Sequence, residues 1–210
     1  MNIEYDKIIT RDNPNILDVG TFDGTDSLMF ANTYPKGHVF SFEADPDVCI
    51  IFKNNIDRYE LPNNNITLIE KAVSDTSGKL IFNRALDDDR KGAGSSGTVL
   101  RPTTHLERHP HVKFEQIEIE CITLDSWFNK QNLDYIDFAW TDVNGAEISL
   151  LRGAQNILKH IKYLQLECID WSLWENQPTK NELLSLIPNF EIIKEDSADM
   201  LLKNKEFLDD

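Results

Sequence analysis

Short apolar runs alternate along the chain with longer segments that have the apolar spacing of helices. Three apolar runs typical of buried strands cover residues 15–19, 38–44 and 65–73. Residues 26–34 and 45–61 lie between them and predict helices, the second with Asp45 as its cap and Pro46 in its first turn. This strand–helix order predicts a parallel sheet with helices on both faces.

The second half of the chain continues the alternation. Further strands are predicted over residues 78–85, 114–124, 134–143 and 162–169, and helices over 123–132 and 145–161. The C-terminal part, 181–205, predicts a helix and then two strands joined by a short turn, which favours an antiparallel hairpin.

We therefore expect one α/β domain spanning residues 1–210, with an inserted β-hairpin and loop region around 79–122. Within it, residues from about 83 to 113 show no clear periodicity. A segment of that length inside a compact domain is typical of a substrate-side loop or lid.

The charge of the chain limits the classes of partner that it is expected to bind. The formal net charge is −15, which argues against nucleic acid as a general partner because phosphate backbones would repel it. No apolar run approaches the length of a membrane span, and residues 1–13 lack the apolar core of a signal peptide. The three cysteines are far apart, so we expect free thiols in a cytoplasmic protein with no membrane partner.

The turn after the first predicted strand, "DVGTFDG", carries the main chemical signal. Gly20 and Gly24 remove Cβ atoms where the chain turns, so a ligand can approach the backbone. The following helix points its N–H groups toward the same place. Glu43 ends the next strand, where its carboxylate can accept hydrogen bonds from both hydroxyls of a ribose. A cofactor that carries a nucleoside is therefore predicted.

The pattern in this turn is DxGxxxG, whereas dinucleotide-binding folds use GxGxxG to hold a pyrophosphate. Asp18 and Asp23 would repel a pyrophosphate but would attract a sulfonium and an ammonium group. This argues for S-adenosyl-L-methionine over NAD as the cofactor.

Five stretches in order resemble the motifs of FkbM-type methyltransferases, which are class I, Rossmann-like enzymes. They are "ILDVGTFDGTDS", "FSFEADP", "KAVSDTSG", "ITLDSW" and "IDFAWTDVNGAEISLLRGA". The chain departs from the family pattern at Asp23 and at Asn144. The resemblance implies a seven-stranded, mostly parallel sheet with an antiparallel C-terminal strand. It also implies methyl transfer from S-adenosyl-L-methionine, most often to a hydroxyl of a sugar, glycan or small metabolite.

Eight residues are candidates for holding the cofactor. Asp18, Gly20, Thr21, Asp23 and Gly24 belong to the first turn, under the methionine end. Glu43 would hold the ribose, while Ala72 and Val73 would meet the adenine edge.

Methylation of an alcohol calls for a base, because the hydroxyl proton is not acidic at neutral pH. Asp142, at the end of the strand 134–143, is the first candidate, although it is equally placed to cap the next helix. His105, in the long loop with His109 and His111, is the second candidate.

Trp171 and Trp174 follow the strand 162–169 and are candidates for stacking on a sugar ring, with packing beneath a loop as the alternative. Asp142, Glu167 and Asp170 could together bind a magnesium ion. Their spacing in the sequence is not specific for a metal site, so no metal ligand is predicted.

Two other functions remain open at this stage. A methyltransferase acting on an RNA cap or other nucleic acid would show a salt-sensitive affinity for RNA. A module that binds the cofactor without catalysis would bind it without turnover. The oligomeric state is not predicted, although an exposed hairpin edge would allow two copies to pair.

Overall fold

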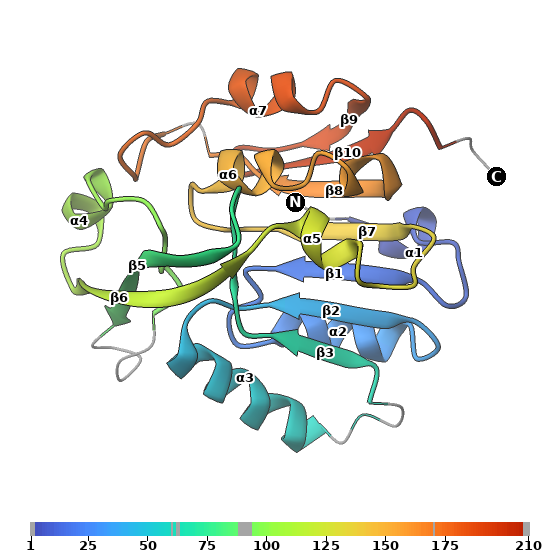
Figure 1. Cartoon of the computed structure of the whole chain (residues 1–210), viewed down its shortest axis with the longest axis horizontal. Coiled ribbons are helices and arrows are strands. Elements are labelled where there is room, and N and C mark those ends of the chain that lie inside the picture. The colour runs from blue at the N-terminus through green and yellow to red at the C-terminus, as the bar shows by residue number, and fades with distance from the viewer. Residues whose placement is uncertain (1–2, 60, 62–63, 88–93, 170, 208–210) are drawn as a thin grey trace.

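The computed structural model describes residues 3–59, 61, 64–87, 94–169 and 171–207. Its centre is a seven-stranded sheet (Figure 1). In spatial order the strands are β3 (Ile66–Ile69), β2 (His38–Phe42), β1 (Asn15–Val19), β7 (Ile136–Thr141), β8 (Ile161–Glu167), β10 (Asp199–Asn204) and β9 (Phe190–Glu195).

The pairing of these strands confirms the expected fold class. The pairs from β3 to β8 are parallel, and β10 is antiparallel to both of its neighbours. The strand order reverses between β1 and β7, which pair from Ile16↔Phe138 to Val19↔Thr141. Ligands of open α/β sheets bind beyond the carboxyl ends of the strands at such a reversal.

Side chains of β1 alternate between two apolar layers, one on each face of the sheet. Leu17 and Val19 face a layer formed with α5 (Leu124–Phe128), α6 (Glu147–Arg152) and α7 (Lys180–Leu186). Ile16 faces the opposite layer, with α1 (Tyr5–Ile8) and α2 (Thr25–Thr33). Both faces of the sheet are thus covered, as a parallel sheet requires.

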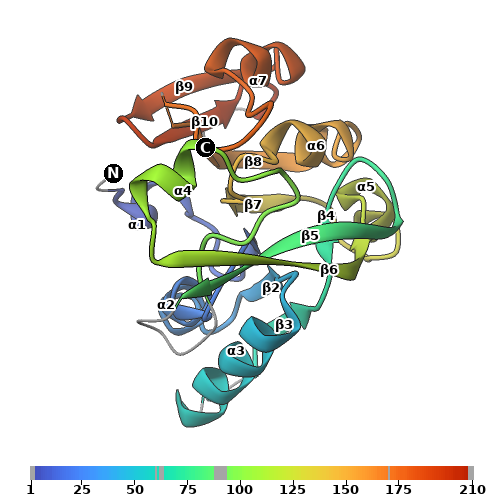
Figure 2. The same ribbon diagram turned by 90° about the vertical axis from the view of Figure 1, so that its left-hand side faces the viewer.

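The inserted region forms a second, three-stranded sheet in the order β4 (Ala72–Val73), β6 (Val112–Ile122) and β5 (Gly78–Asp87). Figure 2 shows the β5–β6 ribbon running across the edge where the central strands end. The aperiodic segment 83–113 thus begins inside β5 and ends inside β6, and it contains α4 (Thr104–Arg108).

Two predicted elements are divided in the structure. The expected strand 65–73 is split between the two sheets, because the chain turns after Ile69, whose carbonyl accepts from the N–H of Lys71. The expected helix 145–161 ends at Arg152 and continues as a short 3-10 helix, η2 (Ile157–His160). At the break, the carboxylate of Asp125 accepts from the N–H groups of Asn156 and Ile157.

The remaining elements are α1, which the sequence did not predict, and α3 (Pro46–Tyr59). At 14 residues, α3 is the longest described helix. None of the helices in the described ranges has the length and hydropathy of a membrane-spanning segment. The three cysteines are free and buried, as expected.

Candidate active site

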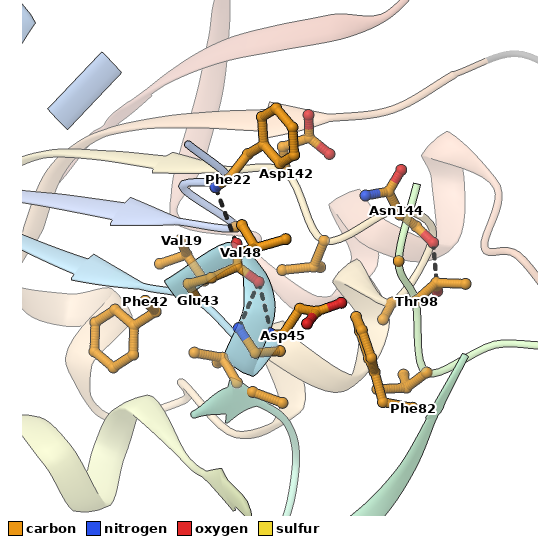
Figure 3. Close-up of a pocket in the computed structure, with 18 of the residues that line it drawn as sticks. Val19, Phe22, Phe42, Glu43, Asp45, Val48, Phe82, Thr98, Asp142 and Asn144 are labelled. Atoms are coloured by element: carbon orange, nitrogen blue, oxygen red, sulfur yellow. Dashed lines mark hydrogen bonds between the residues drawn. The ribbon is translucent and has the colours of Figure 1, made fainter. Parts of the chain in front are cut away.

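A cavity lies at the carboxyl ends of β1, β2 and β7, where the strand order reverses (Figure 3). It holds about 620 Å³ of empty space, including the part open to solvent. Its polar walls include Glu43, Asp45, Thr98, Asp142 and Asn144. Of the residues predicted to hold the cofactor, Gly20, Glu43, Ala72 and Val73 line this cavity.

Gly20 lines this cavity, but the neighbouring backbone is what requires a glycine there. Its φ angle is +85°, and a Cβ would lie 1.7 Å from the carbonyl oxygen of Asp142. The strand ends are drawn together by a hydrogen bond of 2.9 Å from the Asp142 N–H to the Val19 carbonyl. The sequence suggested that Gly20 makes room for a ligand. Close packing of β1 against β7 is a second reason for a glycine at this position.

Asp18 and Thr21 form a buried network behind the turn. The Oδ2 atom of Asp18 accepts hydrogen bonds from the hydroxyls of Thr21, at 2.7 Å, and of Ser27. Burial raises the pKa of Asp18 to about 6. Asp18 and Thr21 are 3% and 4% exposed, and neither is among the described residues that line the cavity.

Asp23 and Gly24 precede α2, and Gly24 is its N-cap residue. Asp23 Oδ1 accepts from the Thr25 N–H and hydroxyl, at 3.1 and 2.7 Å. Gly24 has a φ angle of +82°, and a Cβ there would lie 2.7 Å from the ring of Phe52 on α3. Neither Asp23 nor Gly24 is among the described residues that line the cavity.

Glu43 is held by three backbone N–H groups at the cavity wall. Its Oε2 accepts from Phe22 at 3.0 Å, and its Oε1 accepts from Ala44 and Asp45 at 2.7 and 2.8 Å (Figure 3). Burial raises the pKa of this carboxyl group to about 7, and the hydrogen bonds from Asp45, Ala44 and Phe22 oppose that rise. Each carboxylate oxygen has further lone pairs for hydroxyl donors of a ligand.

Apolar side chains form the wall beyond Glu43. They come from the end of β2, the first turn of α3, the short strand β4 and the ribbon strand β5, and they include Phe42, Val48, Ala72, Val73 and Phe82. A flat, weakly polar ring such as adenine suits such a wall.

Asp45 links this wall to the inserted ribbon. Its carboxylate receives two bonds from the Arg84 guanidinium on β5, from Nε at 3.1 Å and from Nη2 at 3.0 Å. The Nη1 atom of Arg84 lies 3.0 Å from Asp47 on α3. The ribbon is therefore fastened to α3 by a charge-assisted pair of fixed geometry.

Residues 94–100, which we call the cover segment, lie over the opposite side of the cavity. Thr98 pairs with Asn83 of β5 through backbone hydrogen bonds of 2.8 and 3.1 Å, and its hydroxyl donates to the Asn144 carbonyl at 2.8 Å (Figure 3). The Asn144 amide donates to the Ser95 carbonyl at 3.1 Å. Asn144 has a φ of +52°, a conformation that asparagine tolerates better than glutamate or glutamine.

Asp142 lines the cavity at the end of β7. Its Oδ1 atom is buried and receives no hydrogen bond from an N–H or hydroxyl group in the described part of the chain. Glu147 is the first residue of α6, and its carboxylate accepts from the N–H groups of Val143 and Gly145, both at 3.2 Å. Burial raises the pKa of Glu147 to about 7.

His105 and Trp174 pack together away from the cavity. Their rings are stacked with centroids 4.7 Å apart, and they are 3% and 1% exposed. Trp174 also packs against Gly145, and a Cβ added to Gly145 would lie 2.3 Å from the Trp174 ring. Trp171 is 38% exposed and lies under the guanidinium of Arg108, at 5.5 Å. Within the described ranges, the cavity lining contains none of these three predicted residues.

The described residues include no group of three or more histidine, cysteine or acidic side chains arranged to hold a metal ion. Asp170, which the sequence suggested as a magnesium ligand with Asp142 and Glu167, lies outside the described residues.

Comparison with solved structures identifies the fold of the protein. The chain superimposes on an FkbM methyltransferase from Methylobacillus flagellatus KT with a TM-score of 0.55 at 15% identity, covering 91% of this chain and 43% of that one. It also superimposes on a precorrin-6y C5,15-methyltransferase from Geobacter metallireducens GS-15, with a TM-score of 0.50 at 11% identity, covering 94% and 83%. The fold is that of the Rossmann-like methyltransferases, and the chain spans less than half of the Methylobacillus protein.

Sequence comparison then gives the family. The model of the methyltransferase FkbM domain matches residues 18–195, so the chain belongs to the FkbM family of S-adenosylmethionine-dependent methyltransferases. It is also 32% identical over 203 residues to the 2-O-methyltransferase NoeI of Sinorhizobium fredii (strain NBRC 101917 / NGR234), covering 94% of this chain and 82% of that protein.

Several residues of the site were not predicted. Phe82 lines the cavity from the inserted region, and Arg84 fastens that region in place, whereas Thr98, also in the lining, lies in the segment 83–113 that was expected to form a substrate-side loop. No local signal identifies them, since residues of the ribbon reach the cavity through long-range pairing. A local sequence signal does exist for Val48, because it is the first residue on the apolar face of the helix that follows Glu43.

Proposed function

We propose that this protein transfers a methyl group from S-adenosyl-L-methionine to a hydroxyl of a saccharide, glycan or small hydroxylated metabolite. The observation that carries the proposal is the cavity that joins Glu43 at the end of β2 to Asp142 at the end of β7. One wall suits a nucleoside and the other presents a carboxylate to an acceptor. The NoeI relative, by its name, methylates an oxygen, which supports O-methylation.

The residues present fit this cofactor. Glu43 offers carboxylate oxygens to two ribose hydroxyls, and Val48, Ala72, Val73 and Phe82 offer an apolar slot to adenine. Gly20 and Asp142 lie at the other end, where negative charge favours the sulfonium and ammonium groups. When bound, S-adenosylmethionine supplies an electrophilic methyl group.

The protein's own contribution is to position the acceptor, exclude water and take up a proton. The cover segment and Asn144 close one side of the cavity and restrict access of water. Asp142 is the base that we assign to the acceptor hydroxyl, because it is the carboxylate that lines the cavity on the acceptor side.

Calorimetry tests the cofactor assignment. We expect S-adenosylmethionine and S-adenosylhomocysteine to bind and NAD not to bind. Glu43→Ala should weaken S-adenosylhomocysteine binding by about 1–3 kcal/mol. Glu191→Ala, an exposed glutamate on β9, is the matched control and should leave affinity unchanged. Circular dichroism must show that Glu43→Ala is folded, because Glu43 also holds three backbone N–H groups.

Methyl transfer to a panel of methyl glycosides and polyols then tests the reaction, with labelled S-adenosylmethionine and mass detection of the methyl ether. Binding without transfer to any hydroxyl would support a non-catalytic module instead. Salt-sensitive binding and methylation of RNA would replace the acceptor class that we propose.

A further inference from the structure

Phe22 holds a backbone conformation that bulky residues rarely adopt. It lies in the turn after β1, between Gly20 and Gly24, and its φ angle is +50°. Asparagine tolerates this region of φ, whereas a bulky side chain in it is an outlier. The other non-glycine residues of the described chain with a positive φ are all asparagines, Asn64, Asn144 and Asn176. The demands of the turn alone therefore do not account for a phenylalanine at this position.

The conformation of Phe22 is held by a residue of the cofactor wall. The Phe22 N–H donates to Glu43 Oε2 at 3.0 Å, and the turn is closed by a hydrogen bond of 3.1 Å from the Gly24 N–H to the Thr21 carbonyl. Unfavourable backbone conformations persist where the surroundings determine them, and they cluster at active sites and ligand clamps. The position of Phe22 is thus tied to the carboxylate that we assign to the ribose.

The Phe22 side chain lines the cavity and is half-buried. In Figure 3 its ring is drawn with Asp142 on one side of Glu43, and Phe42 and Phe82 are drawn on the other side. The turn that carries Phe22 also touches the Asp142 backbone at Gly20. Phe22 therefore supplies an aromatic wall at the end of the cavity opposite the apolar slot for adenine.

An aromatic ring at this end of the cavity differs chemically from the carboxylates. The face of the ring is negative and attracts a cation within about 6 Å of its centre. In the cofactor proposed above, the sulfonium carries a positive charge that S-adenosylhomocysteine lacks, whereas the ammonium group is common to both. A group that interacts with the sulfonium therefore separates the affinities of the two molecules.

We propose that Phe22 is a specificity-determining residue whose ring binds the sulfonium group and makes the site favour S-adenosylmethionine over S-adenosylhomocysteine. This inference rests on the proposed function for the identity of the cofactor. It adds a role for Phe22 in telling the methyl donor from the spent product. The left-handed conformation of Phe22 is then the cost of presenting a ring, rather than a small side chain, to the cavity.

Calorimetry with both ligands tests the proposal without any acceptor. Phe22→Leu keeps an apolar wall but removes the aromatic face, so the ratio of S-adenosylmethionine affinity to S-adenosylhomocysteine affinity should fall about 3- to 30-fold. Phe22→Tyr keeps an aromatic face and should hold the ratio within about twofold of the wild type. An unchanged ratio in Phe22→Leu, or equal weakening of both ligands, would overturn the proposal.

Phe82→Leu is the matched control, because Phe82 is a second phenylalanine of the lining and belongs to the ribbon strand β5. It should weaken both ligands by the same factor and leave the ratio unchanged. A fall in the ratio equal to that of Phe22→Leu would contradict a particular role for Phe22. If neither ligand binds to the wild type, the proposed function fails together with this inference. If both bind and only the ratio test fails, the proposed function stands alone.

Thermal unfolding separates a binding role from a structural one. Phe22→Asn relieves the unfavourable φ and gives up the apolar contacts of the ring, so its Tm should stay within about 4 °C of the wild type. Its affinity ratio should fall as in Phe22→Leu. A much larger drop in Tm with an unchanged ratio would show that the ring serves the fold, and would refute the proposal.

Discussion

Gly20 and Asp142 approach each other so closely that the carbonyl oxygen of Asp142 occupies the place of a Gly20 side chain, 1.7 Å from an added Cβ. Because the obstacle is backbone, it cannot move away as a flexible side chain would. The contact ties the turn after β1 to the strand end that carries the candidate base.

We expect Gly20→Ala to destabilise the protein by more than about 4 kcal/mol, through the clash and through its φ of +85°. Gly78→Ala is the matched control, because Gly78 also has a positive φ, +143°, but nothing lies within 4 Å of an added Cβ. It should cost about 1–3 kcal/mol from backbone strain alone. Urea denaturation measures both values, and equal losses would refute the role of the contact.

Replacing Arg84 should loosen the inserted ribbon. Arg84→Met removes a bidentate partner from Asp45, which is 3% exposed and would keep a hydrogen bond from the Asp47 N–H but no cationic partner. We expect a loss of about 2–4 kcal/mol in unfolding free energy and weaker S-adenosylhomocysteine binding. Lys79→Met removes an exposed ion pair with Glu118 on the same ribbon and should change stability by less than about 0.5 kcal/mol. Similar values for the two variants would contradict this distinction.

Cofactor affinity should depend on pH through Glu43. The pKa of Glu43 is raised to about 7, so below that pH the carboxylate must lose a proton before it accepts hydroxyl donors. Binding of S-adenosylhomocysteine should therefore strengthen as pH rises from about 5.5 to 7.5, by up to about tenfold per unit below the pKa. Calorimetry of Glu43→Gln over the same range should give a flat profile in that region. A pH dependence that is unchanged in Glu43→Gln would assign the titration to another group.

His105 should act on stability rather than on catalysis. Burial lowers its pKa to about 4, so between pH 6.5 and 4 the unfolded chain binds more protons at this residue and stability falls as pH falls. His105→Phe keeps a ring against Trp174 and removes an Nδ1 atom that is buried without a hydrogen-bond partner in the described structure. Its Tm at pH 5 should exceed that of the wild type, with methyl transfer retained. His111→Phe, at an exposed site, is the control, and loss of turnover in His105→Phe alone would restore His105 as a candidate base.

The sequence was sufficient to predict the parallel sheet, the antiparallel end and the edge of the sheet at which the cavity lies. Those features follow from local signals: apolar strands, a glycine turn and an acidic residue at a strand end. Glu43 is the clearest example, since its place at the end of a strand determines which cavity it faces.

The features that escaped prediction depend on contacts between distant segments. Trp174 is buried beneath Gly145, which no local pattern indicates. The helix predicted over residues 145–161 is interrupted where the carboxylate of Asp125, on another helix, accepts hydrogen bonds from the N–H groups of Asn156 and Ile157. In each case a tertiary interaction overrides a local preference.

The cavity is walled by two separate sheets, with Glu43 and Asp142 on the central sheet and Phe82 on the ribbon. A molecule seated between them acts as a non-covalent cross-link. Its binding energy therefore adds to that of the Arg84–Asp45 pair in resisting separation of the ribbon, and it raises the protein's resistance to proteolysis there by mass action. For the same reason, we expect exchange of the proposed cofactor to depend on how firmly the smaller sheet is docked.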